Sequence, residues 1–427
     1  MNALELKKQL TSGALDARLV ALYGSDALDL QHARYEKAID AFLDLYGNME
    51  GARLLSVAGR SELSGNHTDH NRGCVIAASI DLDIIAVAAP TDERVVRVKS
   101  EGYPEDTVLL DSYTAPDPAR FSRSDAIIAG MCAGMREKGY RVGGFCAYTT
   151  SSVLKGSGLS SSAAFEVMIG NIESNLYNNG TVAAVELAKI AQFAENVYFG
   201  KPSGLMDQMA CALGGIVAID FKDNTAPVVE KIDFDLTAAG YRLCIVDTGG
   251  NHADLTPDYA AVPAEMKAVA AALGGEVLRE TDEAALLAAI PQLRAQLGDR
   301  AILRALHFFA ENKRVTVQKA ALKQGNLAKF LDLVRASGRS SFCYLQNIYT
   351  TKNVAEQGLS LALCLLDGLL ADKPAAWRVH GGGFAGTVQA FVPADTVEAL
   401  RALMDGVFGK GACMVLRVRP EGATTVC

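Results

Sequence analysis

The spacing of apolar residues predicts two amphipathic helices in residues 1–50. Apolar side chains recur there every three or four positions, first around Leu19 and then around Phe42. From Arg53 onward the pattern changes to continuous apolar runs. The run LLSVAG predicts a buried strand, and the run CVIAASIDLDIIAVAAP at 74–90 predicts two strands joined by a short turn.

The rest of the chain repeats this mixture of helices and strands. A Gly/Ser-rich loop leads into an apolar helix at 156–176, and a further helix ends at Gly200. The remaining expected helices lie at 125–138, 259–273, 282–296, 301–322, 326–337, 353–370 and 395–408, and the strands at 143–154, 216–221, 241–249, 377–393 and 412–420. Because this order lacks the regular βαβ spacing of a Rossmann sheet, it favours an α+β architecture of two domains.

Composition narrows the class of protein. The 427 residues carry 41 basic and 49 acidic side chains, a net charge of −8, with no dense basic run. This balance argues against binding to nucleic acid or to an anionic membrane surface. The nine cysteines form no CxxC pair, residues 1–13 contain no signal-peptide core, and no apolar run reaches the ~18 residues of a transmembrane helix. We therefore expect a cytoplasmic protein, and we expect it to be a monomer.

The segment VLKGSGLSSSAA at 153–164 has the composition of a phosphate-binding loop. Its glycines, at 156 and 158, leave room for backbone N–H groups to converge on an anion. The helix that follows would add the positive end of its dipole, and the serine hydroxyls at 160–162 are further donors and Mg²⁺ ligands. The segment is neither a Walker A loop, because no GK[ST] follows, nor a Rossmann fingerprint. A serine-rich helix cap on a turn is the structural alternative.

Polar residues gather at 59–71, in GRSELSGNHTDHN, directly after the apolar strand. Arg, Asn, His and Asp side chains on a loop held by a rigid strand suit a polyhydroxylated ligand. Each hydroxyl needs a donor or an acceptor, and leaving one unpaired costs about 1–3 kcal/mol. His67, Asp69 and His70 also allow a metal site, but no second His cluster completes one. An ordinary solvated loop is the third interpretation.

Two acids and a late glycine run add to these motifs. Glu195 lies late in a helix, and Asp207 follows the turn PSGLM at the start of an apolar segment. Asp207 is either a charge at a helix N-terminus or a functional carboxylate. A kinase needs such an acid near the attacking hydroxyl, together with Mg²⁺ ligands and donors for the phosphates. The run HGGGFAG at 380–386 allows close backbone approach to a ligand or to another strand.

In this order, the motifs resemble those of the GHMP kinase superfamily and, within it, the galactokinase family. The resemblance covers nearly the whole chain, at 59–71, 153–164, 195–208, 304–314 and 379–386. It implies a ribosomal-S5-domain-2-like N-terminal domain, residues 1–220, and a ferredoxin-like C-terminal domain, residues 221–427. A return of the last strand to the first domain is left open. The implied active site lies between the two domains.

The resemblance also implies an activity, the Mg²⁺-dependent transfer of phosphate from ATP to the C1 hydroxyl of galactose. Asp207 would be the base and Arg60 would keep it ionised; the sequence leaves open whether Asp207 takes the proton or only orients the hydroxyl. The residues implied to contact the sugar are Asn66, His67, Asp69, Gly204 and Tyr259. The nucleotide phosphates would lie against Lys155, Gly156, Ser157, Gly158, Leu159, Ser160 and Ser161, and the metal against Ser162 and Glu195.

The chain departs from the family pattern GRxNLIGEHTDY. Glu62 replaces an Asn, Ser64 an Ile, Asn66 a Glu and His70 a Tyr. The family acid at the position of Asn66 binds the 6-hydroxyl of the sugar, and an amide there removes a charge that would repel a 6-carboxylate. Galactose is therefore the first expected substrate, and galacturonate or another C6 or C4 variant is the second. A non-catalytic sugar sensor on the same fold and another GHMP kinase, for mevalonate or homoserine, are the remaining alternatives.

Overall fold

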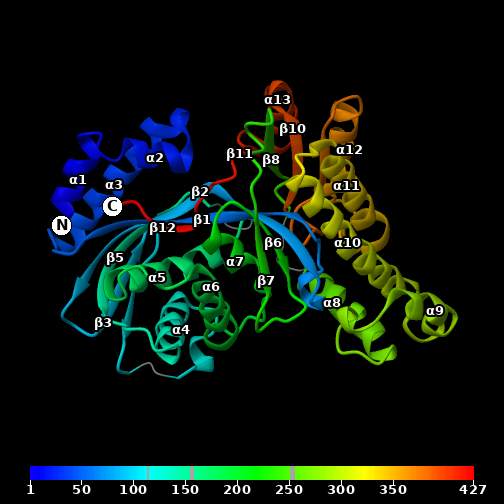
Figure 1. The fold of residues 1–427 in the computed structure, drawn as a ribbon, viewed down its shortest axis with the longest axis horizontal. Helices are drawn as coiled ribbons and strands as arrows, with labels where there is room; N and C mark the ends of the chain where they lie inside the picture. The colour runs from blue at the N-terminus through cyan, green and yellow to red at the C-terminus, as the bar shows by residue number, and fades with distance from the viewer. Residues whose placement is uncertain (113–114, 154–157, 251–254) are drawn as a thin grey trace.

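Two sheets organise the protein, whose computed structural model describes residues 1–112, 115–153, 158–250 and 255–427 (Figure 1). The strands of the first sheet are β1 (Arg53–Ser64), β2 (Cys74–Thr91), β3 (Val95–Ser100), β4 (Glu105–Leu109), β5 (Gly144–Ser151), β6 (Ile216–Asp220), β7 (Val228–Ile232) and β12 (Ala423–Thr425). Their order is β12-β1-β2-β5-β3-β4, and β6 pairs with both β2 and β7.

Helices cover both faces of this first sheet, which explains its continuous apolar runs. One face packs against α1 (Ala3–Thr11), α2 (Asp16–Tyr23) and α3 (Leu28–Tyr46), and the other against α4 (Ser124–Glu137), α5 (Ser161–Tyr177), α6 (Ala184–Phe193) and α7 (Met206–Leu213). Successive residues alternate between the two cores: Leu54 and Ile85 contact the first set, whereas Leu55 and Ala86 contact the second.

The N-terminal segment forms three helices, so the prediction of two was wrong. Gly13 and Gly24, with φ of 77° and 87°, separate the three helices. Only glycine adopts such positive φ values without strain, and it commonly ends a helix for that reason. The apolar spacing marks the buried faces of these helices but does not show where one ends and the next begins.

The run at 74–91 is one long strand, β2, and the predicted turn in its middle is absent. Asp83 lies near the middle of this strand, and its side chain is fully buried. It forms ion pairs with Arg34 and with Arg419, whose Nη1 lies 2.9 Å from Asp83 Oδ2. The charge is therefore neutralised inside the fold, and the strand continues through it.

The second sheet has four strands in the order β11-β8-β10-β9. They are β8 (Tyr241–Asp247), β9 (Ala376–Val379), β10 (Thr387–Pro393) and β11 (Cys413–Leu416). The single strand predicted at 377–393 is instead a hairpin, because the glycine run forms the turn between β9 and β10. Gly381 and Gly383 have φ of 67° and 81° there. We call residues 380–386 the glycine turn.

The remaining helices belong to the C-terminal half. They are α8 (Thr256–Ala272), α9 (Glu283–Leu297), α10 (Asp299–Lys323), α11 (Leu327–Ser340), α12 (Gly358–Leu370) and α13 (Val397–Phe408). One apolar cluster joins the two sheets, with Ile76 from β2, Leu243 from β8 and Phe330 from α11. The packing of this cluster brings the C-terminal end of β1 close to the glycine turn.

Two strand pairings bear on the predicted boundary between the two domains. The strand β12 returns to pair with β1, with Thr425 opposite Leu55. The strand β7 pairs with β6, so the first sheet extends to Ile232. The predicted division at residue 220 thus falls between two paired strands, and the two-domain boundary stays a prediction.

Candidate active site

The predicted catalytic pair is in direct contact. Arg60 projects from β1, and Asp207 lies in the first turn of α7. Arg60 Nε donates to Asp207 Oδ1 at 2.8 Å, and Arg60 Nη2 lies 2.7 Å from the same oxygen. Ser160, which precedes α5, donates its hydroxyl to Asp207 Oδ2 at 2.5 Å. The two ends of the carboxylate are therefore held by different elements.

The charge of Asp207 is set by these contacts. Burial alone would raise the pKa of Asp207, but the Arg60 guanidinium and the hydrogen bonds from Ser160 and Arg60 outweigh it. The pKa of this carboxyl consequently lies below its usual value, and the group is ionised at neutral pH. About a third of the side chain (35%) is exposed, so a ligand can reach it.

The glycine turn holds two of the predicted sugar-binding residues. His67 has its Nε2 2.9 Å from the carbonyl oxygen of Gly382, and the Tyr259 hydroxyl donates to the carbonyl of Gly383 at 2.8 Å. Burial lowers the pKa of His67 to about 4, so its ring is neutral. Because a carbonyl only accepts, Nε2 carries the proton and Nδ1 is the acceptor nitrogen.

Asp69 and Gly204 lie against each other, as expected of neighbours in one site. A Cβ atom added at Gly204 would lie 2.4 Å from Asp69 Oδ2, so any side chain there would displace the Asp69 carboxylate. Gly204 also precedes α7, so this contact brings Asp69 to the same end of the site as Asp207. The Asp69 side chain is 14% exposed.

Asn66 occupies a different position from the other predicted sugar residues. Its side chain is fully buried, and its amide nitrogen donates to the carbonyl of Gly381 at 2.7 Å and to Glu62 Oε1 at 3.3 Å. Its amide oxygen accepts from Ser341 at 3.1 Å and from Asn347 at 2.9 Å. The Asn66 amide is thus engaged by protein groups and does not face an open cavity.

The described part of the phosphate loop is tied to the same centre. Lys155, Gly156 and Ser157 lie outside the described residues, whereas 158–161 are included. Arg60 donates to the carbonyl of Gly158, and its own N–H donates to the carbonyl of Leu159 at 3.1 Å. Leu159 itself is buried, and Ser161 is half-buried at the start of α5.

The two predicted metal ligands offer oxygen donors. Ser162 is exposed on the first turn of α5. Glu195, in a π-helical turn at 194–198, is 3% exposed and accepts from Lys201 Nζ at 2.7 Å and from Gln208 Nε2 at 2.8 Å. A hydroxyl and a carboxylate suit Mg²⁺, which takes few protein ligands and is completed by phosphates and water. These residues therefore fit the ion.

The alternative metal site at His67, Asp69 and His70 gains no support. Within the described residues, no group of three or more His, Cys, Asp or Glu side chains is arranged to hold a metal ion. His67 is instead bonded to the glycine turn.

Two family models match the chain. GHMP kinases N terminal domain covers residues 126–215, and Galactokinase galactose-binding signature covers 40–90. The galactokinase of Streptomyces coelicolor is 31% identical over 382 residues, which make up 89% of this chain and 94% of that protein. The chain belongs to the galactokinase family. Galactokinase activity and the use of ATP follow from this membership.

Solved structures agree with the galactokinase fold. Galactokinase from Lactococcus lactis complexed with galactose superposes with a TM-score of 0.75 at 25% identity, covering 90% of this chain and 98% of that one. The mevalonate kinase of Methanococcus jannaschii, at 16% identity, gives 0.60 over 86% of this chain and 99% of the other, which shows the shared fold alone. The predicted α+β GHMP kinase fold and its enzymatic function are confirmed.

Two departures from the galactokinase pattern lie in contact. Glu62 and Asn66 stand where the family has Asn and Glu, and their side chains are hydrogen-bonded to each other. Glu62 is 4% exposed and also forms an ion pair with Arg378, at 2.5 Å. The acid and the amide have exchanged places, so the cluster keeps one carboxylate.

Several residues that support this galactokinase site were not predicted. His380 lies between the two halves, with Nε2 3.1 Å from Ser61 Oγ and Nδ1 2.9 Å from Thr387 Oγ1. Its position directly before the glycine run is a signal that could have found it. Asn347, which donates to Asn66 and to Gly382, carries no such signal because it lies in an irregular segment.

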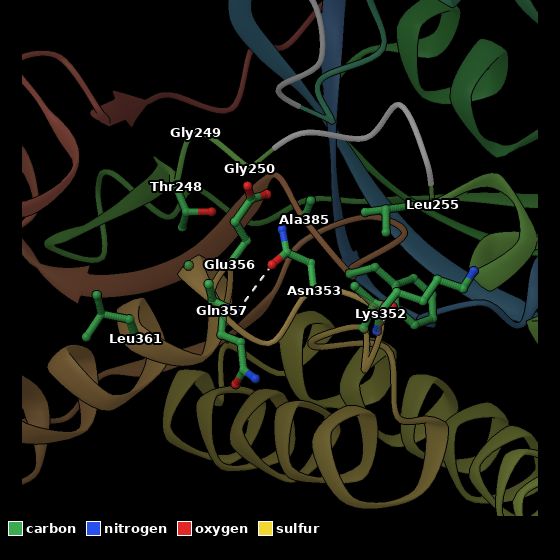
Figure 2. A pocket seen from close by; sticks show the side chains of 14 residues that line it. Thr248, Gly249, Gly250, Leu255, Lys352, Asn353, Glu356, Gln357, Leu361 and Ala385 are labelled. Carbon is green, nitrogen blue, oxygen red and sulfur yellow. Dashed lines mark hydrogen bonds between the residues drawn. The ribbon is translucent and has the colours of Figure 1, made fainter.

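A cleft of about 640 Å³ flanks the site (Figure 2). Its walls come from 248–250 after β8, from Leu255, from residues of 350–357 and the start of α12, and from Phe384 and Ala385 of the glycine turn. Phe384 also packs edge-to-face on Tyr259, with ring centroids 5.3 Å apart. Neither member of the Arg60–Asp207 pair lines it.

The expectation that the chain has no transmembrane helix is addressed for the described residues. No helix among the described residues has both the length and the apolar character needed to cross a bilayer. The cytoplasmic location and the monomeric state stay predictions.

Proposed function

We propose that this galactokinase transfers the γ-phosphoryl group of ATP to the C1 hydroxyl of galactose, with Asp207 beside the attacking oxygen. The observation that carries this assignment is the contact of Asp207 with both Arg60 and Ser160, which joins an ionised carboxylate to the start of the serine-rich loop.

In the proposed reaction, the O1 atom of galactose forms a bond to the γ-phosphorus as the bond to the β-phosphate oxygen breaks. ADP leaves, and the hydroxyl proton passes to Asp207 and then to solvent. Arg60 keeps Asp207 ionised and offers positive charge near the transferred group. The same geometry serves if Asp207 only orients the hydroxyl, because phosphoryl transfer depends mainly on positioning and electrostatics.

The sugar ring is proposed to lie among His67, Asp69 and Tyr259. The neutral His67 presents an acceptor nitrogen and Asp69 presents carboxylate oxygens, so both suit sugar hydroxyls. Gly204 would leave the space that the Asp69 carboxylate needs to face the sugar. Asn66 is proposed to hold the loop against the glycine turn rather than to contact the sugar, since its amide is already bonded.

The nucleotide phosphates are proposed to lie along 155–161, over the N-terminus of α5. Mg²⁺ would be held by Ser162 and Glu195, and its charge would offset the negative charge of the phosphates. Lys201, now paired with Glu195, would have to yield one carboxylate oxygen to the ion.

Galacturonate loses its main support as the substrate. It was favoured because Asn66 removes a negative charge, but Glu62 returns a carboxylate to the same cluster. Assaying phosphorylation of galactose, galacturonate, N-acetylgalactosamine and arabinose tests the assignment. We expect turnover of galactose and a loss of about 10²–10⁴-fold in kcat for Asp207→Asn. If galactose is inert while another sugar is phosphorylated, the assignment is wrong.

A further inference from the structure

Three buried polar side chains form a bridge behind the proposed metal site. Gln208 Nε2 donates to Glu195 Oε2 at 2.8 Å and to Glu166 Oε2 at 3.0 Å. Gln208, Glu166 and Glu195 are 0%, 1% and 3% exposed. One amide therefore joins two carboxyl groups that come from α5 and from the π-helical turn after α6.

This bridge is poorly explained by stability. Glu166 Oε1 and Gln208 Oε1 are buried without a hydrogen-bond partner in the described part of the chain. Burial and the neighbouring charge of Glu195 raise the pKa of Glu166 to about 8. Buried polar groups that are only partly satisfied cost free energy, and an apolar set of similar volume would be at least as stable. Such an arrangement points to a role in function.

The bridge also connects the parts of the proposed site. Glu166 lies four residues after Ser162 on α5, so the two side chains project from the same face of the helix. Gln208 directly follows Asp207 on α7, while its own side chain holds Glu195. The bridge thereby links the proposed metal ligands, Ser162 and Glu195, to the helix that carries Asp207.

We propose that Glu166 and Gln208 are positioning residues, which fix the carboxylate of Glu195 for a divalent ion bound with the nucleotide. Gln208 restrains Glu195 Oε2, which leaves Oε1 to turn toward the ion, and Glu166 restrains Gln208 by accepting its second N–H. This inference rests on the proposed function, because it assumes that Glu195 binds the metal. Neither residue is expected to touch the sugar.

Mn²⁺ binding in the presence of ADP, followed by electron paramagnetic resonance, tests the proposal independently of turnover. We expect Gln208→Met and Glu166→Leu each to weaken Mn²⁺ binding by about ten-fold or more, the usual effect of losing an outer-shell partner of a metal ligand. The apparent KM for Mg²⁺ should rise in parallel, while the KM for galactose stays within about two-fold of wild type. Glu166→Gln keeps an acceptor for Gln208 and should restore most of the Mn²⁺ affinity.

Glu173 provides a matched control on the same helix. It is fully buried, burial raises its pKa to about 8, and it accepts from Gly143 N at 3.2 Å, away from the bridge. Glu173→Leu should lower the thermal unfolding temperature but leave Mn²⁺ affinity unchanged. If Glu166→Leu does not fold, Gln208→Met carries the test.

Wild-type Mn²⁺ affinity in a folded Gln208→Met variant would overturn the inference, as would equal losses in Glu166→Gln and Glu166→Leu. Failure of the wild-type chain to bind Mn²⁺ with ADP, or to phosphorylate galactose, would instead overturn the proposed function.

Discussion

Ser160 gives its hydroxyl to Asp207, 47 positions further along the chain, and not to the helix that it precedes. A serine before a helix commonly caps a backbone N–H of the first turn. Here φ of Ser160 is 59°, a left-handed conformation, and the side chain makes no cap. The local strain thus accompanies a contact with the proposed base, as is frequent at functional sites.

Removing this hydroxyl should affect the chemical step. In Ser160→Ala, Asp207 loses a hydrogen bond of the charged type, worth about 1.5–3 kcal/mol. We expect kcat to fall by about ten-fold or more, with little change in the KM for galactose. Steady-state kinetics measure both constants, and a variant in which only the KM changes would contradict the assigned contact.

The position of the acid limb of the pH–rate profile should depend on Arg60. The carboxylate form of Asp207 is the active one, so activity is lost as the pH falls through its pKa. Arg60 lowers that pKa, and without it burial would raise it. In Arg60→Met the acid limb of kcat/KM should therefore move to higher pH, whatever the overall loss of rate. An unmoved limb would show that Asp207 does not set it.

A side chain at Gly204 should weaken the binding of galactose. In Gly204→Ala the new Cβ would displace Asp69, whose Oδ2 lies 2.4 Å from that position. Since Asp69 is proposed to contact the sugar, the KM for galactose should rise by about ten-fold or more. Gly368→Ala is the control: it lies in α12 with nothing within 4 Å, and should leave the kinetics unchanged and stabilise the helix by up to about 1 kcal/mol.

Restoring the family residues at positions 62 and 66 should be tolerated only when both are changed together. Glu62→Asn leaves Arg378 buried without its ion partner, at a cost of about 3–5 kcal/mol. Asn66→Glu puts a second carboxylate beside Glu62. In the double variant one acid and one amide remain, so we expect a coupling free energy of about 1 kcal/mol or more. Urea unfolding of the four proteins measures it, and additive effects would contradict the pairing.

Lys201 should weaken metal binding while it is paired with Glu195. Its Nζ lies 2.7 Å from Oε1, and the side chain is 58% exposed. Because the Glu195 carboxylate is buried, Lys201 competes with the ion for it, and Lys201→Met should tighten Mn²⁺ binding by about five-fold or more. Lys189→Met, which breaks the pair with Glu186 at 3.4 Å, should leave the affinity unchanged. Weaker Mn²⁺ binding in Lys201→Met would oppose this interpretation.

The sequence carried the identities of Arg60 and Asp207 but not their contact. Motif order placed both in one site, because each lies in a segment with a recognisable pattern. The two residues lie 147 positions apart and are brought together by the packing of α7 on the first sheet, which no local pattern encodes. The structure brings the two side chains into contact, whereas their chemical roles stay predictions.

Asn66 illustrates where sequence reasoning stops. As a polar residue in a sugar signature, it was expected to face the ligand. Its partners Ser341 and Asn347 lie 275 and 281 positions away, in a segment without any motif. Likewise, the two strands predicted at 74–90 form one strand, and Asp83 within it is neutralised by Arg34 and Arg419 from distant parts of the chain. Long-range polar pairing overrode the local signal at both positions.

The pairing of β12 with β1 has a consequence for folding. Thr425 lies opposite Leu55, 370 positions earlier in the chain. Because the entropy of closing so long a loop must be overcome before the contact forms, β12 is expected to join the first sheet late in folding. Until then β1 presents an unpaired edge, which is the part of a sheet most prone to pair with another chain.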